Sequence, residues 1–206
     1  MNLEPIIAQI REKLDSTHGR IIIGIICKPG AGKSTVTNEI SKHFDSGLLS
    51  TVSMDGYHLS NEVLVELGIR NRKGAPDTFD ILGFAQLLNR IKHQQESTIY
   101  FPIFHRVIEE SIYAEGKILP DTKVVLVEGN YLLSDDYGWN QVREYLDFSW
   151  YIHVPEELRQ ARLIARHVEY GKTEEEAMSW ALGSDEQNAL YIEKTAHLAT
   201  SVLELG

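Results

Sequence analysis

The sequence predicts an α/β fold, a doubly wound and mainly parallel sheet flanked by helices, on three observations. Short, continuous apolar runs such as 20–27 and 123–129 have the length of strands that are buried on both faces. The segments between these runs space their apolar residues as amphipathic helices do. Strands that alternate with helices form parallel sheets, because each helical crossover returns the chain to the same edge of the sheet.

Each element has its own pattern. Residues 80–94 predict a helix, because Asp80 stands at an N-cap position and apolar residues then recur on one face. Another helix opens at Pro155 and closes at the C-cap residue Gly171. The predicted strands are 20–27, 48–55, 123–129, 148–154 and 199–205, with a β excursion over 100–120. The predicted helices are 1–14, 32–44, 80–94 and 155–171, and a last one starts within 183–189.

Composition restricts the class of protein. The chain of 206 residues has room for one domain, 1–206, and its net charge of −10 disfavours nucleic acids and anionic membranes as partners. Residues 1–14 lack the pattern of a signal peptide, and no apolar stretch approaches the ~20 residues that span a bilayer. Cys27 is the only cysteine, which excludes an internal disulfide. We therefore expect a cytoplasmic protein.

The segment C-K-P-G-A-G-K-S, 27–34, joins the first strand to the next helix and matches the phosphate-binding pattern G-x-x-x-x-G-K-[ST] except at Cys27. In such a loop, backbone N–H groups and Lys33 bind phosphate oxygens, and Ser34 can bind Mg²⁺. Cys27 precedes the tight part of the loop, so we expect a small buried side chain with a negative φ rather than a reactive thiol. The residues predicted to bind a nucleoside triphosphate are Pro29, Gly30, Ala31, Gly32, Lys33, Ser34 and Thr35.

Two carboxylates, Asp55 and Glu128, each end an apolar strand. Ligands of open α/β sheets gather beyond the carboxyl ends of the strands, so both side chains should lie near the phosphate loop. A carboxylate there can hold Mg²⁺ or accept the proton of an attacking hydroxyl. The alternative is that each residue caps its strand or pairs with a nearby lysine. Two such residues beside one phosphate loop favour the functional interpretation.

Three arginines, Arg159, Arg162 and Arg166, share one face of the helix that opens at Pro155. Guanidinium groups on a helical lid, which we place at about 155–175, can clamp the transferring phosphate and exclude water. The alternative is a solvated basic face that pairs with neighbouring glutamates. We expect that alternative to hold for Arg159.

Five segments, PGAGKST, SMDGYHL, RKGAPDTFD, VVLVEGNYLL and RLIARHVEYGKTEEEA, together resemble the phosphoribulokinase, uridine kinase and pantothenate kinase group of P-loop kinases. More narrowly, the chain resembles bacterial nucleoside or nucleotide kinase-like proteins, some of them labelled fructose-transport kinases, from about residue 20 to about residue 190. The resemblance implies ATP, Mg²⁺ and a small molecule whose hydroxyl accepts the phosphate. It also implies that Asp55 is the general base, that Glu128 lies near Mg²⁺, and that Arg162 and Arg166 serve the lid.

The acceptor is less constrained than the reaction. The segment APDTFD resembles HPDAFD of uridine–cytidine kinases, but Gly74 replaces the aspartate that holds the ribose hydroxyls there. This departure disfavours uridine and cytidine and leaves a nucleoside, a pantothenate-like acid or a sugar open. The candidate acceptor-binding residues are Tyr57, His58, Arg72, Lys73, Phe79, His105 and Arg106.

Simpler interpretations of these residues remain open. Arg72 and Lys73 can be a solvated loop pair, and the His58 imidazole can simply satisfy a backbone carbonyl. Tyr57 and Phe79 can be packed under a rim loop. The cations among the candidates otherwise favour an anionic or polyhydroxylated acceptor.

A rival function is a nucleotide-driven switch or assembly ATPase that phosphorylates no small molecule. The sequence has no recognisable N-K-x-D motif, which disfavours a GTPase. A degenerate nucleotide-binding protein is a third alternative, disfavoured by the presence of Lys33, Ser34, Asp55 and Glu128. A homodimer is compatible with the kinase resemblance, although no segment identifies an interface.

Overall fold

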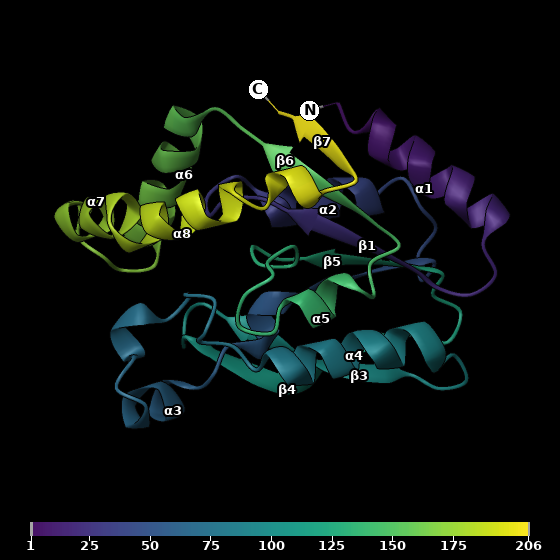
Figure 1. Cartoon of the computed structure of the whole chain (residues 1–206), viewed down its shortest axis with the longest axis horizontal. Helices are drawn as coiled ribbons and strands as arrows, with labels where there is room; N and C mark the ends of the chain where they lie inside the picture. Colours follow the sequence, from purple (N-terminus) through teal and green to yellow (C-terminus); the bar gives the residue numbers. More distant parts are fainter. Residues whose placement is uncertain (1, 206) are drawn as a thin grey trace.

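The computed structural model describes residues 2–205, and it contains a five-stranded parallel sheet with the strand order β2-β5-β1-β6-β7. Helices lie on both sides of this sheet (Figure 1), which confirms the predicted doubly wound architecture. The five strands are β1 Ile21–Ile26, β2 Leu49–Ser53, β5 Val124–Glu128, β6 Phe148–His153 and β7 Ser201–Glu204.

The central strand β1 explains why the sequence shows a continuous apolar run. All six of its residues are buried, and its side chains alternate between two hydrophobic cores. Ile22 and Ile26 face the core beneath α4, whereas Ile21, Ile23 and Ile25 face the core beneath α1 and α2. A strand covered on both faces has no solvent side, so its pattern cannot alternate with polar residues.

The helices cover the sheet and extend beyond it at one end. Their bounds are α1 Glu4–Ser16, α2 Lys33–Ser41, α3 Asn61–Glu66, α4 Ile81–His93, α5 Asn140–Arg143, α6 Glu156–Glu169, α7 Glu174–Leu182 and α8 Ser184–Glu193. Short 3₁₀ turns lie at η1 Met54–Tyr57, η2 Arg70–Arg72 and η3 Ala196–Leu198. None of the helices in the described part of the chain has the length and apolar composition needed to cross a membrane.

The expected β excursion is an antiparallel hairpin of β3 Ile99–His105 and β4 Glu110–Ile118. It lies against η1, where the backbones come close together. A Cβ added to Gly56 would lie 2.2 Å from the carbonyl oxygen of Pro102, which leaves no room for any side chain other than hydrogen. The hairpin thereby holds the turn that carries Asp55.

The lid, placed at about 155–175 from the sequence, contains the helix that was expected to close at Gly171 and a further helix that was not expected. Gly171, with φ of 95°, ends α6, and the chain then forms α7 and α8 beside it (Figure 1). Helix α7 starts with a capping box in which Thr173 and Glu176 bond each other's backbone N–H groups. The sequence analysis did not predict α7, although this start signal is present in the sequence.

Candidate functional site

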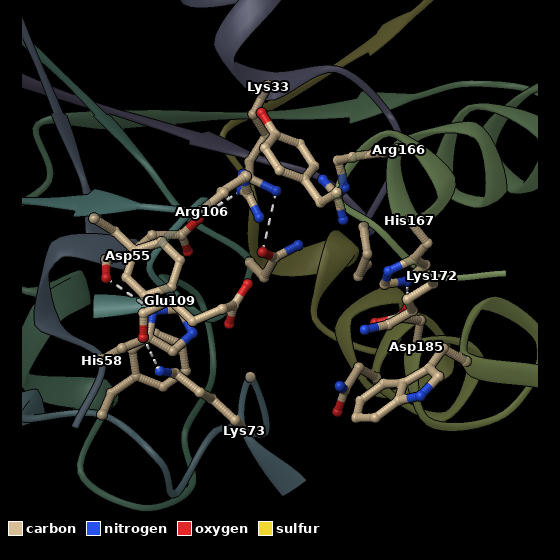
Figure 2. Close-up of a pocket in the computed structure, with 18 of the residues that line it drawn as sticks. Lys33, Asp55, His58, Lys73, Arg106, Glu109, Arg166, His167, Lys172 and Asp185 are labelled. Carbon is tan, nitrogen blue, oxygen red and sulfur yellow. Dashed lines mark hydrogen bonds and ion pairs between the residues drawn. The ribbon is translucent and has the colours of Figure 1, made fainter. Parts of the chain in front are cut away.

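A cavity of about 420 Å³ lies at the carboxyl ends of β1 and β5, between the β3–β4 hairpin and the α6–α8 helices (Figure 2). Its lining comes from the loop after β1, from η1, from segment 70–79, from residues 104–109 of the hairpin, from the loop after β5 and from α6–α8. Parallel sheets bind ligands at this edge, because the loops that leave the strands converge there.

The phosphate loop has the backbone conformation that its glycines predict. Gly30 and Gly32 have φ of 86° and 90°, and a Cβ on Gly30 would lie 2.6 Å from the Arg159 carbonyl oxygen. The backbone of Cys27 does not have a positive φ, and its thiol is completely buried. Burial raises the pKa of that thiol, which makes it a poor nucleophile. Cysteine therefore fits this position as a small buried residue.

The side chain of Asn130, just after β5, links Lys33 to the start of the loop. Its amide NH₂ donates to the Cys27 carbonyl oxygen at 2.7 Å, so its Oδ1 is free to accept from Lys33 Nζ at 3.1 Å. The Lys33 ammonium is therefore held at the mouth of the loop by a neutral acceptor. No carboxylate among residues 2–205 forms an ion pair with it.

Ser34 and Glu128 face each other below the loop. The Ser34 hydroxyl lies 3.0 and 3.1 Å from the two Glu128 carboxylate oxygens and donates to them. Burial raises the pKa of Glu128, although the positive charge of Lys33 opposes this effect. A hydroxyl and a buried carboxylate without an ion-pair partner form the all-oxygen donor set that suits Mg²⁺. The residues present therefore fit the metal that the sequence implies.

Asp55 lies in η1, two residues after the end of β2. Its carboxylate Oδ2 accepts from Arg106 Nη2 at 3.1 Å, and its backbone carbonyl bonds His58 Nδ1 at 2.8 Å. Burial alone would raise the pKa of Asp55, but the positive charges that His58, Arg106 and Lys33 can present outweigh it and hold the pKa below its ordinary value. The carboxylate is therefore ionised at neutral pH.

The three arginines of α6 have three different positions. Arg166 lines the cavity, where burial and the neighbouring Arg106 lower its pKa. Arg162 is exposed beside Gly32 and lies outside the lining. Arg159 is completely buried, forms ion pairs with Glu156 and Glu186, and donates to the Pro29 carbonyl oxygen at 3.1 Å. The pairing with Glu156 agrees with the alternative interpretation of Arg159, but the expected solvated face is wrong at this residue, because its side chain is completely buried.

Four of the seven candidate acceptor-binding residues lie in the cavity lining, namely His58, Lys73, Phe79 and Arg106. The other three, Tyr57, Arg72 and His105, lie outside the lining. Tyr57 packs on Phe84 in the core at a ring separation of 5.1 Å. Arg72 turns outward to pair with Asp77 at 2.7 Å, and His105 pairs with Glu115 at 2.5 Å on the hairpin.

The structure also brings in residues that the sequence analysis missed. Asn130 and Tyr131 follow Glu128 after one glycine, so their position just beyond a strand end was a readable signal. His167, Trp180 and Asp185 come from three different helices, and His167 Nε2 lies 2.7 Å from Asp185 Oδ2. Figure 2 shows His167 and Asp185 across the cavity from Asp55 and His58. Their convergence depends on the packing of α6–α8, which the sequence does not display.

Relatives of the chain share most of its length. Protein YggC of Escherichia coli (strain K12) is 31% identical over 190 residues, which cover 90% of this chain and 78% of that protein. The "Putative uridine kinase C227.14" of Schizosaccharomyces pombe is 30% identical over 195 residues, covering 90% of this chain and 83% of that protein. The crystal structure of a "putative fructose transport system kinase" from Silicibacter sp. TM1040 is 35% identical with a TM-score of 0.90, covering 98% of this chain and 99% of that one.

The family model for phosphoribulokinase and uridine kinase matches residues 22–205. This range starts within β1, includes the phosphate loop, Asp55 and Glu128, and ends after β7. The match therefore extends over every strand of the sheet and every helix after α1, and the chain belongs to the phosphoribulokinase/uridine kinase family of kinases.

Proposed function

We propose that this kinase transfers the γ-phosphoryl group of Mg-ATP to a hydroxyl group of a small molecule. The observation that carries the proposal is the position of Asp55, an ionised carboxylate in the same cavity as Lys33 of the phosphate loop (Figure 2). A base on one side of a cavity and a phosphate cradle on the other are the two groups that transfer to a hydroxyl requires.

In the transfer, the acceptor oxygen forms a bond to the γ-phosphorus, and the bond from that phosphorus to the bridging oxygen of ADP breaks. Asp55 accepts the proton of the acceptor hydroxyl. Lys33 and Arg166 offset the negative charge of the moving group, since both line the cavity and neither is ion-paired in the described chain. ADP leaves with the electron pair of the broken bond.

Ser34 and Glu128 would hold Mg²⁺, which supplies charge neutralisation at the β- and γ-phosphate oxygens. Arg162 lies beside the loop and is available to a nucleotide there, although it is outside the cavity. The catalytic residues we propose are Lys33, Asp55 and Arg166, with Arg162 at the rim.

The test is Asp55→Asn, which keeps the size of the side chain but removes the base. We expect kcat to fall by about 10² or more while the KM for ATP stays unchanged. ADP release is measured with Mg-ATP across nucleosides, pantothenate, ribulose 5-phosphate and hexoses. Turnover at the wild-type rate in the variant would contradict the role of Asp55. Hydrolysis that responds to a protein but to no hydroxyl compound would instead favour a nucleotide-driven switch.

A further inference from the structure

We propose that the acceptor carries an anionic group, a carboxylate or a phosphate monoester, besides the hydroxyl that is phosphorylated, and that Lys73 and Arg70 bind this group. The inference rests on the proposed function, because it concerns the acceptor in the same cavity. Six cationic side chains line the cavity against three carboxylates, in a chain with a net charge of −10. The cations are Lys33, Arg70, Lys73, Arg106, Arg166 and Lys172, and the carboxylates are Asp55, Glu109 and Asp185.

Most of these cations already have an interaction. Lys33 and Arg166 lie where the triphosphate is expected, and Arg106 is paired with Asp55. Lys172 lies over the Trp180 ring, 4.8 Å from its centroid. Arg70 and Lys73 remain, and within residues 2–205 neither has a carboxylate at ion-pair distance. Figure 2 shows Lys73 at the opposite side of the cavity from Lys33.

Lys73 is held in place by neutral partners only. Its Nζ donates to the Glu109 carbonyl oxygen and to Asn61 Oδ1, the latter at 2.8 Å, and lies 5.3 Å from the centroid of the Phe104 ring. An ammonium group has three N–H donors, so one remains for a ligand. Burial lowers the pKa of Lys73, although the nearby Glu110 and Glu109 carboxylates oppose this effect. Neither carboxylate is at ion-pair distance, so an anion in the cavity would be the first charged group to bond the ammonium directly.

The hydroxyl end of the acceptor lies at Asp55 and His58. Burial lowers the pKa of His58, so its imidazole is neutral at pH 7. The Nδ1 atom faces the carbonyl oxygen of Asp55 and must carry the proton, which leaves Nε2 as a hydrogen-bond acceptor. The Phe79 and Phe104 rings lie 4.1 and 4.7 Å from the imidazole and keep it in this orientation. The Phe104 ring contacts both the His58 imidazole and the Lys73 ammonium, so the cavity places acceptors for hydroxyls beside an unpaired cation (Figure 2).

The experiment compares matched compounds that differ in the anionic group. The protein is saturated with Mg²⁺ and a nonhydrolysable ATP analogue, and binding is measured by calorimetry. The pairs are D-glycerate with glycerol, pantothenate with pantothenol, and D-ribulose 5-phosphate with D-ribulose, which separate a carboxylate from a phosphate. We expect at least one anionic compound to bind about tenfold or more tightly than its neutral partner, as one charge-assisted hydrogen bond predicts.

Two neighbouring variants provide the test and its control. Lys73→Met should weaken binding of the anionic compound about tenfold or more and leave its neutral partner unchanged, whereas a merely structural role of Lys73 would weaken both. Arg72→Met should change neither, because Arg72 is paired with Asp77 outside the cavity. Three outcomes would each overturn the inference. The first is equal affinity within every pair, the second is anion binding that Lys73→Met leaves unchanged, and the third is no binding of any anionic compound.

Turnover separates this inference from the proposed function. Asp55-dependent ADP release with neutral alcohols, equal to that with their anionic partners, would overturn the anionic acceptor and leave the kinase reaction intact. Lys73-dependent binding of an anion that never leads to phosphorylation would keep the anion site and contradict the proposed transfer.

Discussion

The amide of Asn130 has an orientation that its two partners determine. The Cys27 carbonyl can only accept a hydrogen bond and Lys33 can only donate one, so the NH₂ and the oxygen of Asn130 each have one correct position. The residue thereby joins the end of β5 to both ends of the phosphate loop. This arrangement also explains how a chain with cysteine at position 27 keeps the loop in place, since the bond uses only the backbone of that residue.

Asn130→Leu has a similar size but neither hydrogen-bonding group. The Cys27 carbonyl then loses its side-chain partner, and we expect the free energy of unfolding to fall by about 1–3 kcal/mol. Urea unfolding measures this change. Asn188→Leu is the control, because Asn188 also lines the cavity but makes no side-chain hydrogen bond within the described residues. Equal stability of the two variants would show that the Asn130 bonds contribute nothing.

His58 should make the stability depend on pH. Burial lowers its folded pKa below the ordinary 6.5, so the unfolded chain takes up the proton at a higher pH than the folded protein does. Neutral His58 therefore contributes fully to the free energy of unfolding above about pH 6.5. This contribution is lost as the pH falls from there to the folded pKa. We expect His58→Gln to lose less unfolding free energy than the wild type between pH 7 and pH 5. The exposed His18→Gln should follow the wild type.

The sequence predicted single residues best where the backbone alone sets their position. Glu128 is the last residue of β5, and the loop glycines have the positive φ that the motif requires. Tyr57 lies outside the cavity lining, because in a 3₁₀ turn neighbouring side chains point in different directions, and that of Tyr57 packs against the core. Asp185 was missed because its approach to His167 depends on tertiary packing.

At the scale of elements, Arg159 is the residue through which three segments meet. It lies on α6, its guanidinium bonds the Pro29 carbonyl oxygen of the phosphate loop, and it pairs with Glu186 of α8. A buried guanidinium with five donors is suited to such a junction, because it can satisfy several acceptors at fixed angles. The α6–α8 layer is therefore attached to the loop that it covers.

Arg159→Met keeps much of the apolar stem but leaves the loop carbonyl and two carboxylates without their donor. Both carboxylates are partly exposed and can hydrate, so the main cost comes from the Pro29 carbonyl that loses its donor and from the lost charge-assisted bonds, and we expect a loss of about 1–3 kcal/mol in the free energy of unfolding. Arg162→Met, on the exposed face of the same helix, should cost much less. Denaturant unfolding of the two variants measures the difference, and similar losses would contradict the junction.

Elements were predictable in proportion to the strength of their local pattern. The buried strands and α4 were confirmed, because continuous apolar runs and a wide apolar face are unambiguous. The short helices α3 and α5 were not predicted, since four to six residues carry little periodicity. The helix expected to close at Gly171 and the one expected to start within 183–189 are present as α6 and α8, whereas α7 between them was not predicted.

On the scale of the whole molecule, the cavity lies between two parts of the chain that are distant in sequence. The η1 turn and the hairpin contribute lining residues on one side, the α6–α8 layer contributes those on the other, and the phosphate loop adds Pro29 and Lys33. A ligand that contacts all three should stabilise the entire folded state, because it binds only when these parts are assembled.

ATP should therefore raise the stability of the whole protein. At a concentration about 100 times the Kd, it adds about 2.7 kcal/mol to the free energy of unfolding, seen as a higher Tm. We expect Lys33→Ala to lose most of this increase, because the ammonium no longer contacts the phosphates. Lys42→Ala, exposed at the far end of α2, should keep it. An unchanged ATP effect in Lys33→Ala would contradict the role assigned to the loop.

The contact between Pro29 and Arg159 also has a consequence for synthesis of the protein. The two residues are 130 positions apart, and Arg159 is itself held by Glu186 still later in the chain. On the ribosome, the phosphate loop emerges well before α8, but its last contacts are made only after α8 has been translated. A nascent chain thus completes its nucleotide cradle only once α8 has left the ribosome.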